Sequence, residues 1–301
     1  MFKKKRLIIL DSNSIIHRAF YALPLLKTKK GELVNAVYGF FLVFFKAIKE
    51  FQPDYIAACF DFPAPTFRHK EYKEYKITRP PTPKDLALQI PKIKEILKAF
   101  NVPIFEKEGF EADDIIGTIS ERFQGEKIIL SGDLDTLQLV DKNTKIYLLK
   151  TGVKNTILYD EKLVGEKYQG LKPEQIVDFK ALKGDPSDNI PGVEGIGEKT
   201  AIDLIQKFNN LEGVYQNLEK IKPKLREMLI QQKEKAFFSK MLAKIKRDVP
   251  IDFNLEKCEW GKYQKEKIAQ IFRELEFKTL IKRLEEINGG LKNENLKLWQ
   301  N

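Results

Sequence analysis

Residues 6–11 have the sequence RLIILD, in which four apolar residues lead to an aspartate. Similar apolar runs follow as YIAACFD at 55–61, KIILSGD at 127–133 and KIYLLK at 145–150. Such runs are typical of strands buried on both faces of a sheet, and the segments between them have helical periodicity and the length of crossover connections. The pattern predicts an α/β fold with a central, mostly parallel sheet flanked by helices.

Three of these four predicted strands end in a carboxylate, namely Asp11, Asp61 and Asp133. The carboxyl ends of parallel strands meet at one edge of a sheet, where open α/β folds place their functional sites. We therefore expect the three side chains to lie at one edge.

Further acids occur at the predicted ends of elements. The sequence EADD starts an amphipathic helix, SGDLD follows the third strand, and GDPSDN lies in a loop. They add Glu111, Asp113, Asp114, Asp135, Asp185 and Asp188. A single aspartate at a helix start is most often a cap. Capping does not explain why nine acids gather in a chain of positive net charge.

Carboxylates held close together repel one another and raise one another's pKa unless a cation lies between them. No His or Cys is near these positions, so a hard divalent cation, Mg²⁺ or Mn²⁺, is the ligand that this set of side chains predicts. Two such ions activate water and neutralise both oxygens of a phosphodiester displacement. The acids therefore point to metal-dependent phosphodiester chemistry.

Residues 62–84 interrupt the alternation of strands and helices with prolines and with alternating cations and rings. Cations that hold phosphates and rings that stack on bases are typical of single-stranded nucleic-acid binding. A solvated surface segment is the plainer alternative. Because the segment leaves the sheet directly after Asp61, it must rise beside the predicted metal site.

Residues 192–200 have the sequence GVEGIGEKT, which is neither a P-loop nor a dinucleotide fingerprint, because no strand precedes it and Glu198 separates the last glycine from the lysine. A tight glycine hairpin between two helices fits better. The backbone N–H groups of Gly195 and Gly197, with Lys199, would bind a phosphate at the helix start. A glycine cap without a ligand is the alternative.

The chain has 301 residues, of which 32% are charged and 43% apolar, a balance typical of globular proteins. Its net charge of +10 favours a polyanionic partner, such as nucleic acid or an acidic membrane surface. Two distant cysteines, Cys59 and Cys258, exclude a disulfide framework and a cysteine zinc site. The most apolar stretch, residues 36–45, is too short to span a bilayer, and the apolar run at the start is too short for a signal peptide. We expect a cytoplasmic protein.

We expect three regions along the chain. Residues 1–160 form an α/β core that carries the excursion at about 62–84. Residues 161–285 form a helical region with the glycine hairpin at about 185–210. Residues 286–301 have the polarity of a tail or linker.

Taken together, these motifs resemble the 5′ nuclease family, meaning the N-terminal 5′–3′ exonuclease domain of bacterial DNA polymerase I and its flap endonuclease relatives. The resemblance runs from about residue 7 to about 280, through LDSNS, HRAFYALP, AVYGF, FRHKEYKEYKITRPPTP, EADDIIG, SGDLDTLQL and GDPSDNIPGVEGIGEKTA. It implies a PIN-like mixed sheet, a helical arch at 62–84, and a helix-three-turn-helix around the glycine hairpin that grips duplex DNA, often with bound K⁺.

The resemblance also implies roles for individual residues. The residues at the positions of the family's tighter metal site are Asp11, Asp61, Glu111, Asp113 and Asp133. The residues at the positions of acids that complete or support a second site are Asp114, Asp135, Asp185 and Asp188. DNA contacts correspond to Arg68, Tyr75, Lys76, Arg79, Gly195, Gly197, Lys199 and Thr200, of which Lys76 and Arg79 contact the scissile phosphate. Ser12 stands where the family usually has Gly.

The function that this resemblance implies is Mg²⁺-dependent removal of 5′ flaps and RNA primers in DNA replication and repair, giving 5′-phosphate and 3′-hydroxyl products. The expected partners are flapped, nicked or branched duplex DNA and RNA–DNA primers. We also consider a separate DNA polymerase as a partner. We expect a monomer associated with the nucleoid, either stand-alone or excised from a polymerase. A non-catalytic junction-binding protein and a ribonuclease of the PIN class are the alternatives.

Overall fold

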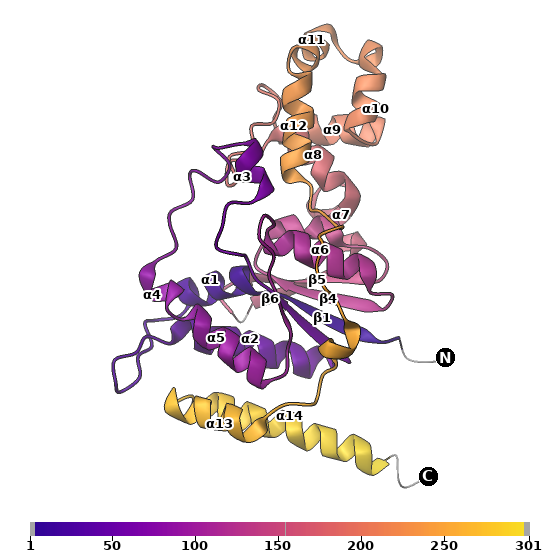
Figure 1. Cartoon of the computed structure of the whole chain (residues 1–301). Helices are drawn as coiled ribbons and strands as arrows, with labels where there is room; N and C mark the ends of the chain where they lie inside the picture. Colours follow the sequence, from indigo (N-terminus) through magenta and orange to yellow (C-terminus); the bar gives the residue numbers. More distant parts are fainter. Residues whose placement is uncertain (1–3, 154, 298–301) are drawn as a thin grey trace.

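The computed structural model describes residues 4–153 and 155–297. Its centre is a six-stranded sheet in the order β3-β2-β1-β4-β5-β6 (Figure 1). Every neighbouring pair is parallel except β5 and β6, which are antiparallel. The strands are β1 (Arg6–Asp11), β2 (Tyr55–Cys59), β3 (Ile104–Phe105), β4 (Glu126–Ser131), β5 (Thr144–Thr151) and β6 (Asn155–Tyr159).

The four strands predicted from apolar runs are all present, and the mostly parallel sheet is confirmed. The sequence did not predict β3 and β6. β3 has only two residues, too few to show a period. β6 returns antiparallel to β5 after Gly152, whose φ of 67° suits a tight reversal.

Successive residues of β1 face opposite sides of the sheet, as strand geometry requires. Ile8 and Leu10 belong to one core, under α1 (Ser12–Ala22), α2 (Asn35–Phe51) and α5 (Ile90–Ala99). Leu7 and Ile9 belong to the other core, under α6 (Ala112–Arg122). Both free cysteines are buried in this second core. The sheet is thus covered on both faces, which explains why its strands are apolar throughout.

A separate helical region packs around its own core beyond the sheet (Figure 1). Its helices are α8 (Ile176–Lys183), α9 (Glu198–Phe208), α10 (Leu211–Gln216), α11 (Pro223–Gln231) and α12 (Lys233–Ala243). The preceding helix, α7 (Glu161–Lys167), buries its Val164 in the second core of the sheet. The chain also forms short 3₁₀ helices, in the core as well as in the helical region: η1 (Leu134–Leu139), η2 (Pro173–Gln175), η3 (Leu218–Lys220) and η4 (Leu255–Cys258).

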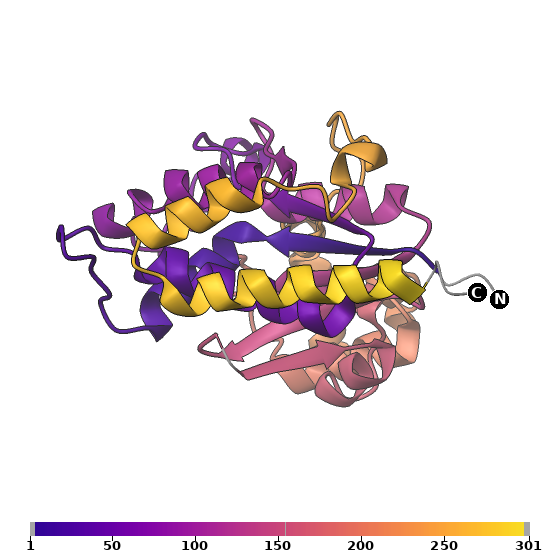
Figure 2. The ribbon, with the colours of Figure 1, turned by 90° about the horizontal axis from the view of Figure 1, so that it is seen from below.

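The C-terminal helices belong to the α/β core and not to this helical region. After α12 the chain runs back past the sheet to α13 (Lys265–Glu274) and α14 (Lys278–Lys297), which lie along α5 and α2 (Figure 2). Their residues Ile268, Phe272 and Leu280 are fully buried in the core that holds α2. The predicted region 161–285 therefore divides into two parts in space.

Helix α14 continues to Lys297, beyond its buried residues Leu280 and Leu284. The first part of the tail predicted at 286–301 is therefore helical. Residues 298–301 lie outside the described chain. In the described ranges, every helix is too short or too polar to cross a bilayer.

The excursion at 62–84 holds one short helix, α3 (Phe67–Glu71), before turns and an extended proline run lead to α4 (Lys84–Ala87). The helical arch that the resemblance implies is therefore mostly non-helical here. Pro80, Pro81 and Pro83 prevent a continuous helix, and Lys76 has a left-handed φ of 56°. The turns place Lys76 and Arg79 over the carboxyl edge of the sheet.

Candidate active site

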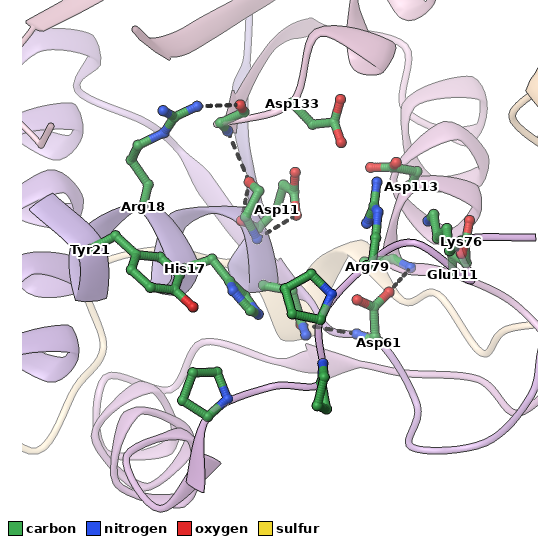
Figure 3. Close-up of a pocket in the computed structure, with 17 residues that line it drawn as sticks. Asp11, His17, Arg18, Tyr21, Asp61, Lys76, Arg79, Glu111, Asp113 and Asp133 are labelled. Atoms are coloured by element: carbon green, nitrogen blue, oxygen red, sulfur yellow. Dashed lines mark hydrogen bonds and ion pairs between the residues drawn. The ribbon is translucent and has the colours of Figure 1, made fainter. Parts of the chain in front are cut away.

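A cavity of about 430 Å³ lies at the carboxyl end of the parallel strands (Figure 3). Its carboxylates come from the end of β1, the segment after β2, the start of α6 and the segment after β4. They are Asp11, Asp61, Glu111, Asp113 and Asp133. The cations Lys76 and Arg79 reach the same cavity from the excursion. The convergence predicted for the strand-end aspartates is thus present, and Glu111 and Asp113 join them.

Backbone and hydroxyl donors hold the first two aspartates in place. Asp11 caps α1 by accepting from the backbone N–H of Ser14 at 3.2 Å, and it also accepts from the Ser131 hydroxyl at 2.5 Å. Asp61 accepts from the backbone N–H of Ala112 at 2.8 Å, at the start of α6. Capping and site formation therefore use the same side chains, so the two interpretations of these residues are compatible.

The other two aspartates, Asp113 and Asp133, are less constrained. One oxygen of Asp133 accepts from the backbone N–H of Asp135 at 2.9 Å, whereas Asp113 accepts no hydrogen bond from any described residue. Among the described residues, Asp11, Asp61, Asp113 and Asp133 form no ion pair. Most of their lone pairs are therefore available to a ligand.

Burial, with a smaller contribution from neighbouring acids, raises the pKa values of three of these aspartates. Burial, with smaller contributions from Asp133 and Asp61, raises the pKa of Asp11 to about 6. Burial and the charges of Asp11 and Asp133 raise the pKa of Asp113 well above its usual range. Burial also raises the pKa of Asp61. A bound cation would reverse all three shifts, because it favours the charged form.

Glu111 differs because protein cations surround it. Burial alone would raise its pKa, but Lys76 and Arg68 outweigh burial and lower it. The Lys76 ammonium lies 2.6 Å from one carboxylate oxygen of Glu111, and the Tyr75 hydroxyl donates to the other at 3.1 Å. Glu111 thus anchors the excursion to the start of α6.

Arg68 and Asp114 form a buried ion pair. Arg68 is 2% exposed and donates to both oxygens of Asp114, at 2.8 and 2.9 Å, and to the backbone carbonyls of Leu242 and Lys244. Asp114 is fully buried and does not line the first cavity, but it accepts from the backbone N–H of Glu111 at 3.2 Å, as a supporting acid would. The roles of Arg68 in DNA contact and of Asp114 at a metal site stay predictions.

Tyr75 and Asp188 are also buried. Tyr75 is 4% exposed, and its hydroxyl donates to Asp188 at 3.3 Å as well as to Glu111. Asp188 forms ion pairs with Arg79 and, at 3.8 Å, with Lys76. Tyr75 therefore packs under the excursion and does not form an exposed stacking platform. Asp188 lines neither the first cavity nor the second one, described next, and its metal role stays a prediction.

A second cavity, of about 720 Å³, adjoins the first, with Asp133, Arg18 and Arg79 lining both. It contains Asp135 and Asp185, and the ammonium of Lys180 lies between these two carboxylates. Burial raises the pKa of Asp135 to about 6, although Lys180 opposes this, whereas Lys180 lowers the pKa of Asp185 to about 2 against the effect of burial. The nine predicted acids thus divide between two cavities and two buried ion-pair clusters.

The fit to divalent cations can be judged from the donor set. Within residues 4–153 and 155–297, no three acid, histidine or cysteine side chains are already arranged around a single point to hold a metal ion. The four aspartates of the first cavity nevertheless offer carboxylate oxygens with free lone pairs, and burial raises the pKa values of Asp11, Asp61 and Asp113. This is the chemistry that hard cations such as Mg²⁺ and Mn²⁺ select. The residues present fit such an ion.

Five residues of α1 line the first cavity without having been predicted as site residues: Asn13, Ser14, His17, Arg18 and Tyr21, of which the last three are labelled in Figure 3. Arg18 donates to the Gly132 carbonyl at 2.9 Å, and burial lowers the pKa of His17. The sequence offered a signal, because residues at i, i+1 and i+4 after a strand-end aspartate fall on one side of the following helix.

The glycine hairpin has the close backbone approach that its sequence suggests. Gly192 has φ of 65°, and a Cβ there would lie 2.3 Å from the backbone N of Gly184. Gly195 and Gly197 are exposed, as is Lys199, and Thr200 is half-buried at the start of α9. Their role in DNA contact stays a prediction. Glu198, in the same turn, forms an ion pair with Lys183 at 2.8 Å.

Two family models match the chain. The model for the 5′–3′ exonuclease N-terminal resolvase-like domain matches residues 6–169, and the model for the 5′–3′ exonuclease C-terminal SAM fold matches residues 171–266. Together they span the core, the excursion and the helical region.

Curated relatives agree with these models. The chain is 47% identical to DNA polymerase I of Caldicellulosiruptor bescii, over 93% of this chain and 33% of that protein. It is 41% identical to a 5′–3′ exonuclease of Aquifex aeolicus, over 94% of this chain and 96% of that one. The chain therefore spans about a third of the polymerase relative and nearly all of the exonuclease.

Solved structures share the fold at low sequence identity. The T5 5′-exonuclease with bound zinc has a TM-score of 0.66 at 19% identity, covering 95% of this chain and 99% of that one. The catalytic core of Rad2 in complex with DNA substrate has a TM-score of 0.57 at 17% identity, covering 91% and 88%. The matched models and relatives, with five carboxylates gathered at the carboxyl edge of the sheet, show that the chain belongs to the 5′–3′ exonuclease family.

Proposed function

We propose that this protein is a structure-selective 5′–3′ exonuclease and 5′-flap endonuclease that hydrolyses DNA phosphodiesters with divalent metal ions. The observation that carries the proposal is the first cavity, where Asp11, Asp61, Asp113 and Asp133 have no ion-pair partner among the described residues. An uncompensated carboxylate cluster of this kind is suited to hold Mg²⁺ or Mn²⁺, because a bound cation would favour the charged forms of Asp11, Asp61 and Asp113, whose pKa values burial raises.

Two ions are proposed, one held by the first cavity and one by Asp133 with Asp135 and Asp185. When bound, such ions supply an activated water and neutralise charge on the phosphodiester. Lys76 and Arg79 would donate to the non-bridging phosphate oxygens, where charge grows in the transition state. They reach the cavity from a segment that lies over the sheet edge, so a strand entering under the excursion meets them first.

For DNA recognition we propose two contacts. The duplex would lie on the hairpin, against the backbone N–H groups of Gly195 and Gly197 with Lys199 and Thr200, which can read the phosphate backbone and not the sequence. K⁺ at this hairpin is part of the proposal. The 5′ single strand would pass between the excursion and the first cavity. The T5 flap endonuclease, which shares the fold, has been solved in complex with DNA and metal ions.

The biological setting is also proposed. Removal of 5′ flaps and RNA primers during replication and repair suits a protein whose curated relatives include DNA polymerase I. We propose that the chain acts as a monomer at the nucleoid, together with a DNA polymerase that is either a separate protein or part of the same polypeptide.

The test is single-turnover cleavage of an end-labelled 5′-flap duplex with Mg²⁺ and with EDTA, with the cut mapped to the nucleotide. We expect a metal-dependent cut at or next to the junction, and Asp133→Asn should bind the flap without cutting it. Tight binding with no cut under any divalent ion would favour a junction-binding protein instead. Preferential cutting of an RNA flap would favour a PIN-class ribonuclease.

A further inference from the structure

The two cavities differ in how their negative charge is balanced. In the first, Asp11, Asp61, Asp113 and Asp133 form no ion pair with any described residue. In the second, Asp135 and Asp185 share the ammonium of Lys180, which lies 2.6 Å from Asp185 and in a short contact with Asp135. In the first cavity only Glu111 pairs with a protein cation, Lys76, and the other four carboxylates have none among the described residues. In the second, one ammonium bridges both Asp135 and Asp185.

Lys180 is held firmly in this position. It lies on α8, is 8% exposed, and reaches out to η1 on one side and to the loop after α8 on the other. Asp185 is fixed in turn by the backbone N–H and hydroxyl of Ser187, at 2.9 and 2.7 Å. The ammonium therefore points at the inward-facing oxygens of both carboxylates.

An ammonium and a divalent ion compete for such a place. Lysine has three donors and no acceptor, so carboxylate lone pairs directed at it are not available to a metal. A positive charge a few ångströms away also opposes a second positive charge, more strongly in a partly buried site than in water. A second divalent ion can bind Asp135 and Asp185 only when Lys180 withdraws.

We propose that Lys180 occupies the second cation position and competes with the divalent ion there. The chain then binds one divalent ion readily in the first cavity and a second only at higher concentration, so Lys180 sets the metal concentration at which both sites fill. This inference rests on the proposed function and adds to it the order in which the sites are filled. Lys180 acts on the metal through Asp135 and Asp185, and is a positioning residue.

The test is Mn²⁺ binding to the full chain without DNA, measured by electron paramagnetic resonance and calorimetry. We expect Lys180→Met to leave the tighter ion unchanged and to bind the weaker ion about tenfold more tightly, since one opposing charge is removed. Lys180→Gln, which can still donate to one carboxylate, should change in the same direction. Lys180→Arg keeps the charge and should resemble the parent protein.

Lys240→Met is the matched control, because Lys240 likewise bridges two acids, Asp178 of α8 and Glu212, but lines neither cavity. It should leave both Mn²⁺ affinities unchanged. Unchanged or weaker second-ion binding in both neutral Lys180 variants would overturn the inference. Thermal melts distinguish competition from a purely structural ion pair. If the pair is only structural, Lys180→Met lowers the Tm equally in EDTA and in Mg²⁺. Competition predicts instead that Mg²⁺ restores the Tm of the variant.

These outcomes are separable from those of the proposed function. If the parent protein cuts the flap and binds Mn²⁺ but neutral variants at position 180 bind it identically, only the role of Lys180 is wrong. If the parent protein binds no divalent ion and cuts no flap, the nuclease proposal fails and the inference fails with it.

Discussion

Asp113 has the least compensated charge in the first cavity, since it accepts no hydrogen bond from the described residues and the charges of Asp11 and Asp133 oppose its ionisation. Asp113→Asn removes this repulsion. We expect the variant to melt at a higher temperature than the parent in EDTA, by a degree or more, and to lose at least about 10²-fold in single-turnover cleavage with Mg²⁺. Thermal melts and flap cleavage measure the two effects. A variant that is less stable in EDTA would contradict the electrostatic account.

The same repulsion predicts an unusual pH dependence of stability without metal. Asp11 and Asp135 have pKa values of about 6 in the folded protein, against an ordinary aspartate value of 3.8. Between these values the folded state binds more protons than the unfolded state, so the free energy of unfolding falls as pH rises. We expect the free energy of unfolding to decrease from about pH 4 to pH 6 in EDTA. Each group lowers it by about 1.4 kcal/mol for every pH unit that separates the folded and unfolded pKa values of that group.

Urea unfolding at half-unit pH steps measures this slope. Asp11→Asn should reduce it, because one of the two titrating groups is then absent. Saturating Mg²⁺ should also reduce it, because a bound cation lowers both pKa values. Asp185, whose pKa is lowered to about 2, contributes in the opposite sense but only below about pH 4. A free energy of unfolding that rises from pH 4 to pH 6 in EDTA would exclude raised carboxylate pKa values.

Between elements, Arg68 joins α3 to α6 and to the end of α12, through Asp114 and two backbone carbonyls. Arg68→Ala would leave the fully buried Asp114 without its cation, and removal of one partner of a buried pair typically costs about 3–5 kcal/mol. We expect a loss of that size in the free energy of unfolding, measured by urea denaturation.

Arg79→Ala is the matched control from the same excursion, because the Arg79 side chain is 45% exposed and its ion pair with Asp188 is partly solvated. Its loss of stability should be about 1 kcal/mol or less. Its single-turnover cleavage should slow at least tenfold, with little change in flap binding. Equal destabilisation by the two variants would contradict the division between a structural and a catalytic arginine.

The elements also show what the sequence could and could not predict. The strand-end aspartates converged as expected because periodicity and parallel pairing alone bring Asp11, Asp61 and Asp133 to one edge. Burial of Arg68, Tyr75 and Asp114 was not predictable, because it depends on α12 and the loop at Asp188, which are distant in sequence. Charge patterns identify cations and acids but not which of them pair with one another.

At the scale of the whole molecule, the least predictable feature is the return of the chain to the core. Local patterns after residue 161 predict only helices, and α13 and α14 have the amphipathic character of any surface helix. What fixes their place is the excess of phenylalanine on α2, which needs an apolar cover on its far side. The second family model ends at residue 266, although curated relatives align over 93–95% of the chain.

Phe272 on α13 tests whether this cover stabilises the fold. Its ring contacts those of Phe41 and Phe45, with centroids 5.8 and 6.2 Å apart, and it is fully buried. Truncation of a buried phenylalanine typically costs about 3–5 kcal/mol, so we expect Phe272→Ala to lower the free energy of unfolding by that amount. Ile230→Ala is the control, because Ile230 is 55% exposed and its truncation should change stability by about 0.5 kcal/mol or less. Since Phe272 lines neither cavity, the folded fraction of Phe272→Ala should cleave a 5′ flap at the parent rate below its melting temperature. If Phe272→Ala is as stable as the parent, the C-terminal helices are an appendage, and the α/β core is complete without them.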